Sequence, residues 1–168
     1  FIDSGDVRES VEKRLTQSTT MLTPEYFRQL SKAVKDFWDG YDADTEFREE
    51  LKAKVSQFLD DKAILDGPHN LVECSTDATD LRMELPLMVL APEKSEHVRR
   101  IMQLAGEMGF AVIPRGGGSG CTGGAVPARR RTVVLSLTRL KKILSVNPKD
   151  LTICLEAGVI TLQATRAA

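Results

Sequence analysis

The feature that most constrains this chain is a run of glycines between residues 116 and 124. Six of these nine residues are glycine, and the run follows Pro114 and Arg115. Glycine has no Cβ, so such a segment can take positive φ and bring its backbone close to a ligand. Successive backbone N–H groups can then form an anion-binding concavity, to which Arg115 and the hydroxyls of Ser119 and Thr122 would add donors. The run therefore predicts a phosphate or pyrophosphate site.

Two familiar phosphate-binding motifs do not fit this run. A P-loop requires Gly-Lys-Ser/Thr after four spacer residues, and no lysine lies in the run. Residues 118–123 match the string GxGxxG, but a dinucleotide fingerprint opens a helix and has an acid about 20 residues later. Here three arginines at 129–131 lead toward another strand, and no acid lies near Ile143. A purely connecting loop is the remaining alternative, and so many glycines would make it costly in entropy.

The distribution of charge divides the chain near Gly67. Residues 1–66 hold 15 acids and 10 bases, a net charge of −5, whereas residues 67–168 hold 9 acids and 13 bases, a net charge of +4. We therefore predict two domains with the limits 1–66 and 67–168.

The first domain is predicted to be helical. Apolar residues recur at helical spacing, and Thr23-Pro24 is typical of a helix start. Gly40 is expected to break the second helix, with Asp42, Asp44 and Thr45 offering caps for a third that ends at 66–68. We interpret this domain as a structural extension, with a docking surface for another subunit as the alternative.

The second domain changes to alternating strands and helices. A helix is predicted over 95–108 with Gly109 as its C-cap, followed near the end of the chain by a helical start over 162–167. The predicted strands cover residues 87–90, 110–113, 132–137, 143–146 and 151–155. This order indicates an α+β fold.

Other residues that often mark sites are interpreted as structural. The three cysteines have no ligand spacing and are expected to be reduced thiols, and both histidines are expected on the surface or in packing. The arginines at 129–131 have no aromatic partners and indicate a solvated turn, so we predict neither a metal site nor a nucleic-acid partner. No apolar run approaches the roughly 20 residues of a membrane span and no signal peptide is visible. We expect a cytoplasmic protein, with peripheral membrane association left open.

Several segments of the second domain are each similar to one known family, and they follow in that family's order. They cover residues 74–79, 88–92, 95–108, 114–127, 134–140, 143–146 and 156–159. The family is that of the FAD-linked oxidases, the superfamily of vanillyl-alcohol oxidase and p-cresol methylhydroxylase. The branch that the chain resembles is that of D-lactate dehydrogenase and the flavin subunit of glycolate oxidase.

The resemblance implies a helical amino-terminal extension followed by the first α+β lobe of a p-cresol methylhydroxylase-type FAD-binding domain. Some relatives tether the flavin through a histidine at the position of Ser119, so serine here implies noncovalent FAD. The cofactor-binding residues that it implies are Pro114, Arg115, Gly116, Gly117, Gly118, Ser119, Gly120, Gly123, Gly124 and Gly158. Of these, Gly158 is expected to permit close approach to the cofactor.

The resemblance also implies an activity. The intact relative would oxidise a 2-hydroxy acid such as D-lactate or glycolate by hydride transfer to flavin. The catalytic residues are expected outside this chain, which we read as an incomplete fragment that is inactive alone. Its expected partners are FAD and the remainder of the flavoenzyme or another redox subunit. Two alternatives remain: a non-catalytic assembly or regulatory module, and a flavin reductase of the enolpyruvyl-UDP-sugar type.

Overall fold

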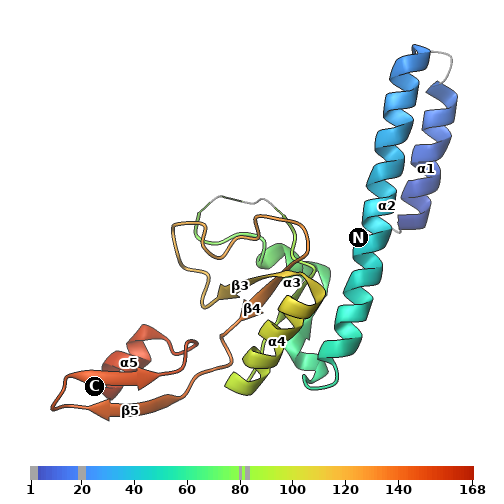
Figure 1. The fold of residues 1–168 in the computed structure, drawn as a ribbon. Coiled ribbons are helices and arrows are strands. Elements are labelled where there is room, and N and C mark those ends of the chain that lie inside the picture. Colours follow the sequence, from blue (N-terminus) through green and yellow to red (C-terminus); the bar gives the residue numbers. More distant parts are fainter. Residues whose placement is uncertain (1–3, 19–21, 80, 82–83) are drawn as a thin grey trace. The chain divides into compact units, whose positions relative to one another are not determined.

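The computed structural model describes residues 4–18, 22–79, 81 and 84–168. They form two compact units, one within residues 1–47 and one within residues 48–168 (Figure 1). These units reflect packing, and the domain limits 1–66 and 67–168 stay a prediction.

The first unit is a pair of helices. Helix α1 covers Ser4–Gln17, and α2 covers Pro24–Val55, of which the first part lies in this unit. The Arg8 guanidinium joins the two helices, because it donates to the Asp42 carboxylate at 3.1 Å and lies 5.1 Å from the centre of the Trp38 ring. Trp38 is buried as a result.

The predicted helix break at Gly40 is wrong, because α2 runs through it as one helix of 32 residues. A mid-helix glycine costs about 1 kcal/mol relative to alanine, which the contacts of Trp38 and Asp42 with α1 can offset. Two of the residues proposed as caps are engaged differently. Asp42 pairs with Arg8, and the Thr45 hydroxyl donates backwards to the carbonyl of Tyr41, as in a helix interior.

The second unit contains a four-stranded sheet with the order β1-β2-β4-β3. Strands β2, β4 and β3 are parallel, and β1 pairs with β2 in the antiparallel sense. Helix α4 connects β2 to β3 and lies beside the sheet in Figure 1. The bounds are β1 Ile64–Leu65, β2 Met88–Leu90, α4 Ser95–Met108, β3 Ala111–Arg115 and β4 Thr132–Ser136.

The core of this unit lies at the two central strands. All residues of β2 and β4 are buried, and Val89 and Val134 pack with Leu71. Leu71 belongs to α3, Pro68–Glu73, which follows the short 3-10 helix η2, Asp61–Ala63. The sequence reading placed a helix end at Pro68, whereas α2 ends at Val55 and Pro68 begins α3.

A β-hairpin and a short helix follow the sheet. Strand β5, Ile143–Asn147, pairs antiparallel with β6, Thr152–Leu155, and α5 covers Thr161–Ala167. Every residue of β5 is exposed. The α+β fold class and the predicted strands and helices of the second domain are confirmed, with end residues that differ by one or two positions.

Candidate functional site

The glycine loop begins where β3 ends, at the pairing of Arg115 with Ser136 of β4. Only two of its glycines have positive φ, Gly118 at 68° and Gly123 at 74°. A Cβ on Gly123 would also lie 3.0 Å from the Leu81 side chain. These two glycines are therefore required by the shape of the loop itself.

Other glycines of the loop border open space. A Cβ added to Gly116 or Gly120 would meet no atom within 4 Å, and one on Gly117 would meet only the Ser119 hydroxyl at 4.0 Å. The protein's own packing thus gives no reason for glycine at 116 or 120. A ligand that approaches the backbone would give one, so the loop fits the phosphate-binding prediction.

The segment 76–79 holds the start of the loop. The Arg115 guanidinium donates to the carbonyl of Thr76 at 2.6 Å and lies against Gly118. The Asp77 carboxylate accepts hydrogen bonds from the hydroxyl and the N–H of Thr79. These bonds, helped by the N–H of Ala125 and the charge of Arg115, hold the pKa of Asp77 below its usual range. Arg115 thus ties the start of the loop to the segment 76–79, and Asp77 fixes the turn within that segment.

A cleft of about 410 Å³ lies beside the glycine loop, in the lower part of the range for ligand sites. Four of the predicted residues line it: Gly116, Gly117, Ser119 and Gly158. The other predicted residues do not: Pro114, Arg115, Gly118, Gly120, Gly123 and Gly124. The structure therefore brings one side of the glycine loop together with the turn at Gly158.

The position of Gly158 is fixed by the chain's own backbone. Its N–H donates to the carbonyl of Leu140 at 2.8 Å, and an added Cβ would lie only 2.1 Å from the carbonyl oxygen of Leu137. Close approach of two backbone segments thus explains the glycine here. The expected approach of a cofactor to Gly158 stays a prediction.

Several cleft residues were missed by the sequence analysis. They come from the turn after β4, the turn after β6 and the start of α5, and they lie within or next to segments 134–140 and 156–159 that carried the family resemblance. The polar ones are Thr138, Lys141, Thr161 and Gln163, and the apolar ones are Ala157, Val159 and Ile160. Lys141 is the only ionisable side chain among the described residues that line the cleft.

The described residues offer few other sites. All three cysteines are free, with Cys121 and Cys154 exposed and Cys74 half-buried. Burial raises the pKa of the Cys74 thiol. Within the described ranges, no three His, Cys, Asp or Glu side chains gather to hold a metal ion. No helix of that part of the chain is long and apolar enough to cross a membrane.

Comparisons with known proteins agree with this geometry. Residues 86–168 match the family described as FAD binding domain. The chain is 33% identical over 93 residues to the glycolate oxidase subunit GlcD of Bacillus subtilis, covering 55% of this chain and 20% of that protein. It is 32% identical over 123 residues to the alkyldihydroxyacetonephosphate synthase of Dictyostelium discoideum, covering 68% of this chain and 20% of that protein.

The fold has a matching solved structure. It is p-cresol methylhydroxylase with substrate bound, at a TM-score of 0.61 and 22% identity, covering 71% of this chain and 24% of that chain. This likeness shows the fold and confirms the expected architecture. The chain spans about a fifth of the length of the two curated relatives described above.

Proposed function

Because residues 86–168 belong to the FAD binding domains of the FAD-linked oxidases, we propose that the glycine loop of this chain binds the FAD pyrophosphate. FAD is the cofactor of this domain family, and it supplies a hydride acceptor when bound. Gly116, Gly117 and Ser119 would hold the pyrophosphate through backbone N–H groups at the cleft. Ser119 cannot form the tether that a histidine forms, so the cofactor would be held noncovalently.

The observation that carries this proposal is the open space beside Gly116 and Gly120. Both residues lie in a loop whose start is tied by Arg115 to the carbonyl of Thr76, and no side chain of the loop fills that space. No carboxylate among the described residues lines the neighbouring cleft. An anion bound there would therefore meet backbone donors and no like charge.

A matched pair of glycine variants tests the loop in the protein that carries this chain. Gly116→Ala and Gly106→Ala both place a Cβ where no atom lies within 4 Å, and neither glycine has positive φ. Gly106 is on α4, away from the loop. We expect Gly116→Ala to weaken FAD binding about tenfold or more by flavin fluorescence titration, because the methyl group fills the ligand's space. Gly106→Ala should bind FAD normally, and equal affinities in the two variants would contradict the proposal.

We propose further that the intact protein oxidises a 2-hydroxy acid, such as D-lactate or glycolate. The groups that take the proton and bind the carboxylate would lie outside residues 1–168. Two observations support this placement of the catalytic groups. The chain spans about a fifth of the length of the two curated relatives, and Lys141 is the only ionisable side chain lining the described cleft. One lysine offers no paired acid and base for proton transfer.

The substrate proposal is tested with an electron-accepting dye and a panel of 2-hydroxy acids. The intact protein should reduce the dye on addition of D-lactate or glycolate, and residues 1–168 alone should not. Turnover by residues 1–168 alone would contradict the placement of the catalytic groups. Failure of every 2-hydroxy acid with the FAD-loaded intact protein would contradict the substrate class.

A second candidate is the activity of an alkyldihydroxyacetonephosphate synthase. The Dictyostelium protein of that name matches 68% of this chain, while residues 67–168 are 102 of 168 residues, or 61%. The similarity therefore extends into the residues before 67. Formation of alkyldihydroxyacetone phosphate by the intact protein, without dye reduction by 2-hydroxy acids, would favour this candidate.

A further inference from the structure

We propose that Lys141 supplies the positive charge that binds the FAD pyrophosphate from the second wall of the cleft. This inference rests on the proposed function, because it assumes that the glycine loop faces a pyrophosphate. It adds a binding residue that neither the glycine run nor the family resemblance indicated.

The cleft has a single charged side chain among its described lining residues. Its described lining contains eleven residues, of which Lys141 is the only charged one. Thr138, Thr161 and Gln163 add neutral donors from the same turns. Among the described residues, no carboxylate forms an ion pair with the Lys141 ammonium, whereas Lys52 is paired with Asp66 and Lys54 with Glu50. A diphosphate carries negative charge that backbone N–H groups alone compensate only in part.

Two arginines near the loop are already engaged. Arg115 donates to the carbonyl of Thr76 at 2.6 Å and packs against Gly118. Arg139 forms ion pairs with Glu93 and Asp60, and also donates to the carbonyl of Ala91. These guanidinium groups position the loop and the following turn. Lys141 is left as the cation that faces the cleft without such a partner among the described residues.

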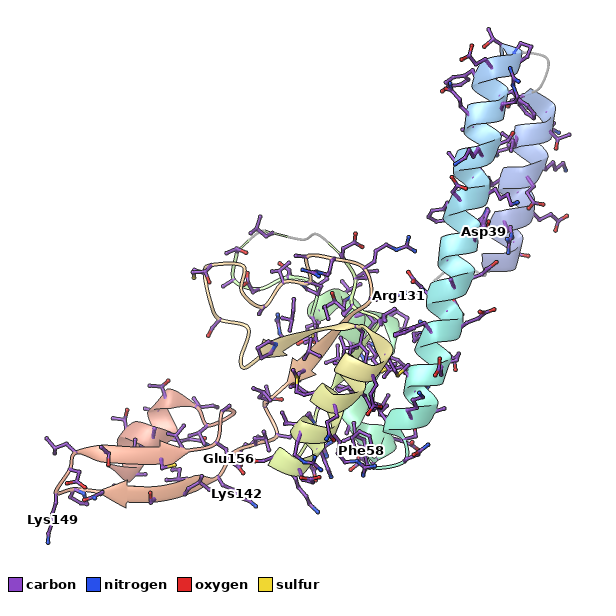
Figure 2. The ribbon with its side chains drawn as sticks, viewed as in Figure 1. Asp39, Phe58, Arg131, Lys142, Lys149 and Glu156 are labelled. Carbon is purple, nitrogen blue, oxygen red and sulfur yellow. The ribbon has the colours of Figure 1, made fainter. Side chains whose placement is uncertain are left out.

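The backbone of Lys141 is fixed on both sides. The carbonyl of Leu140 accepts the N–H of Gly158 at 2.8 Å, and the carbonyl of Lys142 accepts the N–H of Glu156 at 2.8 Å. The Lys142 N–H also donates to the Glu156 carboxylate at 2.7 Å, and these two residues lie side by side in Figure 2. Three hydrogen bonds thus hold the neighbours of Lys141, so its side chain starts from a defined point on the cleft wall.

The test compares neighbouring lysines in the intact protein. Lys142 follows Lys141 directly and is exposed, but it does not line the cleft. We expect Lys141→Ala to weaken FAD and ADP binding about tenfold by calorimetric titration, Lys141→Arg to stay within about threefold, and Lys142→Ala to bind as the unchanged protein does. ADP is included because it carries the pyrophosphate without the flavin.

The salt dependence gives a second readout that a merely structural role would not move. Raising NaCl from about 0.05 to 0.5 M should weaken FAD binding to the unchanged protein more than to Lys141→Ala. Salt screens the attraction between the Lys141 ammonium and the pyrophosphate, and the variant lacks that attraction. Equal melting temperatures of the variants would show that the fold is intact.

The outcomes separate this inference from the proposed function. If the unchanged protein binds FAD, but Lys141→Ala and Lys142→Ala lose equal or no affinity, the role of Lys141 is overturned and the glycine-loop proposal stands. If Gly116→Ala binds FAD as tightly as the unchanged protein, the proposed loop site fails, and the role of Lys141 fails with it. Loss of affinity for FAD and ADP confined to Lys141→Ala supports the inference.

Discussion

Strands β4 and β5 have the same length and similar apolar content, yet they lie in opposite environments. Every residue of β4 is buried between β2 and β3, whereas every residue of β5 is exposed in a hairpin. Leu135 in β4 has 3% of its surface exposed, and Leu144 in β5 has 59%. The same kind of side chain therefore contributes differently to stability in these two regions of one unit.

The difference shows that the sheet and the hairpin are stabilised by different interactions. The four-stranded sheet gains free energy from buried apolar area, at about 25 cal/mol per Å². A two-stranded hairpin is marginal alone. This one is held at its base by two backbone hydrogen bonds between residues 140–142 and 156–158 and by the bond from the Lys142 N–H to the Glu156 carboxylate. The cleft thus has one wall on a loop of the stable sheet and another on the turns that flank the hairpin and lead into α5.

The largest expected effect comes from the same leucine substitution in the two strands. Leu135→Ala should lower the free energy of unfolding by about 2–5 kcal/mol, because it leaves a cavity in the core. Leu144→Ala should change it by less than about 0.5 kcal/mol, because the side chain is exposed. Urea denaturation of both variants measures the two changes in the free energy of unfolding. Similar losses of stability in the two variants would contradict the difference in burial between β4 and β5.

A second prediction concerns the junction at Gly158. Gly158→Ala should cost about 1–3 kcal/mol, because its Cβ would lie 2.1 Å from the Leu137 carbonyl oxygen and the turn must shift. We expect faster hydrogen exchange of the β5 and β6 amides and unchanged exchange in β4. Gly106→Ala is the control, because its Cβ would meet no atom within 4 Å, and it should leave the exchange of the hairpin amides unchanged. Equal protection of the hairpin in the variant and the unchanged protein would count against this role.

The cysteines sharpen the comparison further. Cys154 is exposed on β6. Cys74 instead packs against the buried cluster of Leu71, Val89 and Val134, and burial raises the pKa of its thiol. In a Cys121→Ser background, a thiol reagent at pH 8 should modify Cys154 about tenfold faster than Cys74. The two rates should converge in denaturant, and a faster Cys74 in the folded protein would contradict the burial difference.

The smallest expected effect is a pH dependence in the sheet region. The Lys52 ammonium donates to the Asp66 carboxylate at 2.6 Å, which lowers the pKa of Asp66 from 3.8. A lowered carboxyl pKa adds stability that is present above pH 3.8 and is lost as the pH falls through the folded value. The pair is partly exposed, so its contribution should be about 1 kcal/mol or less.

Acid denaturation of the Asp66→Asn variant measures this contribution. The variant should lose less stability than the unchanged protein between pH 5 and pH 3, an interval of about 1 pH unit on either side of the ordinary pKa of 3.8. The same acid sensitivity in both proteins would show that the ion pair contributes nothing.

Features that depend on local physics were predictable from the sequence. Apolar residues such as Val98 and Ile101 recur at helical spacing, and Gly109 can take the left-handed conformation that ends a helix. The structure confirms both bounds of α4 and gives Gly109 a φ of 76°. The positive φ of Gly118 and Gly123 was predictable for the same reason, since glycine has no Cβ to oppose that conformation.

Features that depend on contacts distant in sequence were not predictable. The helix continues through Gly40 because Asp42 meets Arg8, 34 residues earlier. Lys141 reaches the cleft because hydrogen bonds join its neighbours to Glu156 and Gly158. Within the predicted site, Gly118 and Gly123 serve the turn and do not line the cleft, a division that the glycine pattern alone does not encode.

The two edge strands of the sheet have a consequence for association between molecules. Strand β1 has only two residues, and β3, at the opposite edge, contains exposed Pro114, which has no N–H to donate. A strand from another molecule could form only a few backbone hydrogen bonds with β1, and its hydrogen bonds with β3 would be interrupted at Pro114. The sheet of the described residues therefore ends at both edges in poor templates for strand addition, and the proline that leads into the loop interrupts one of these edges.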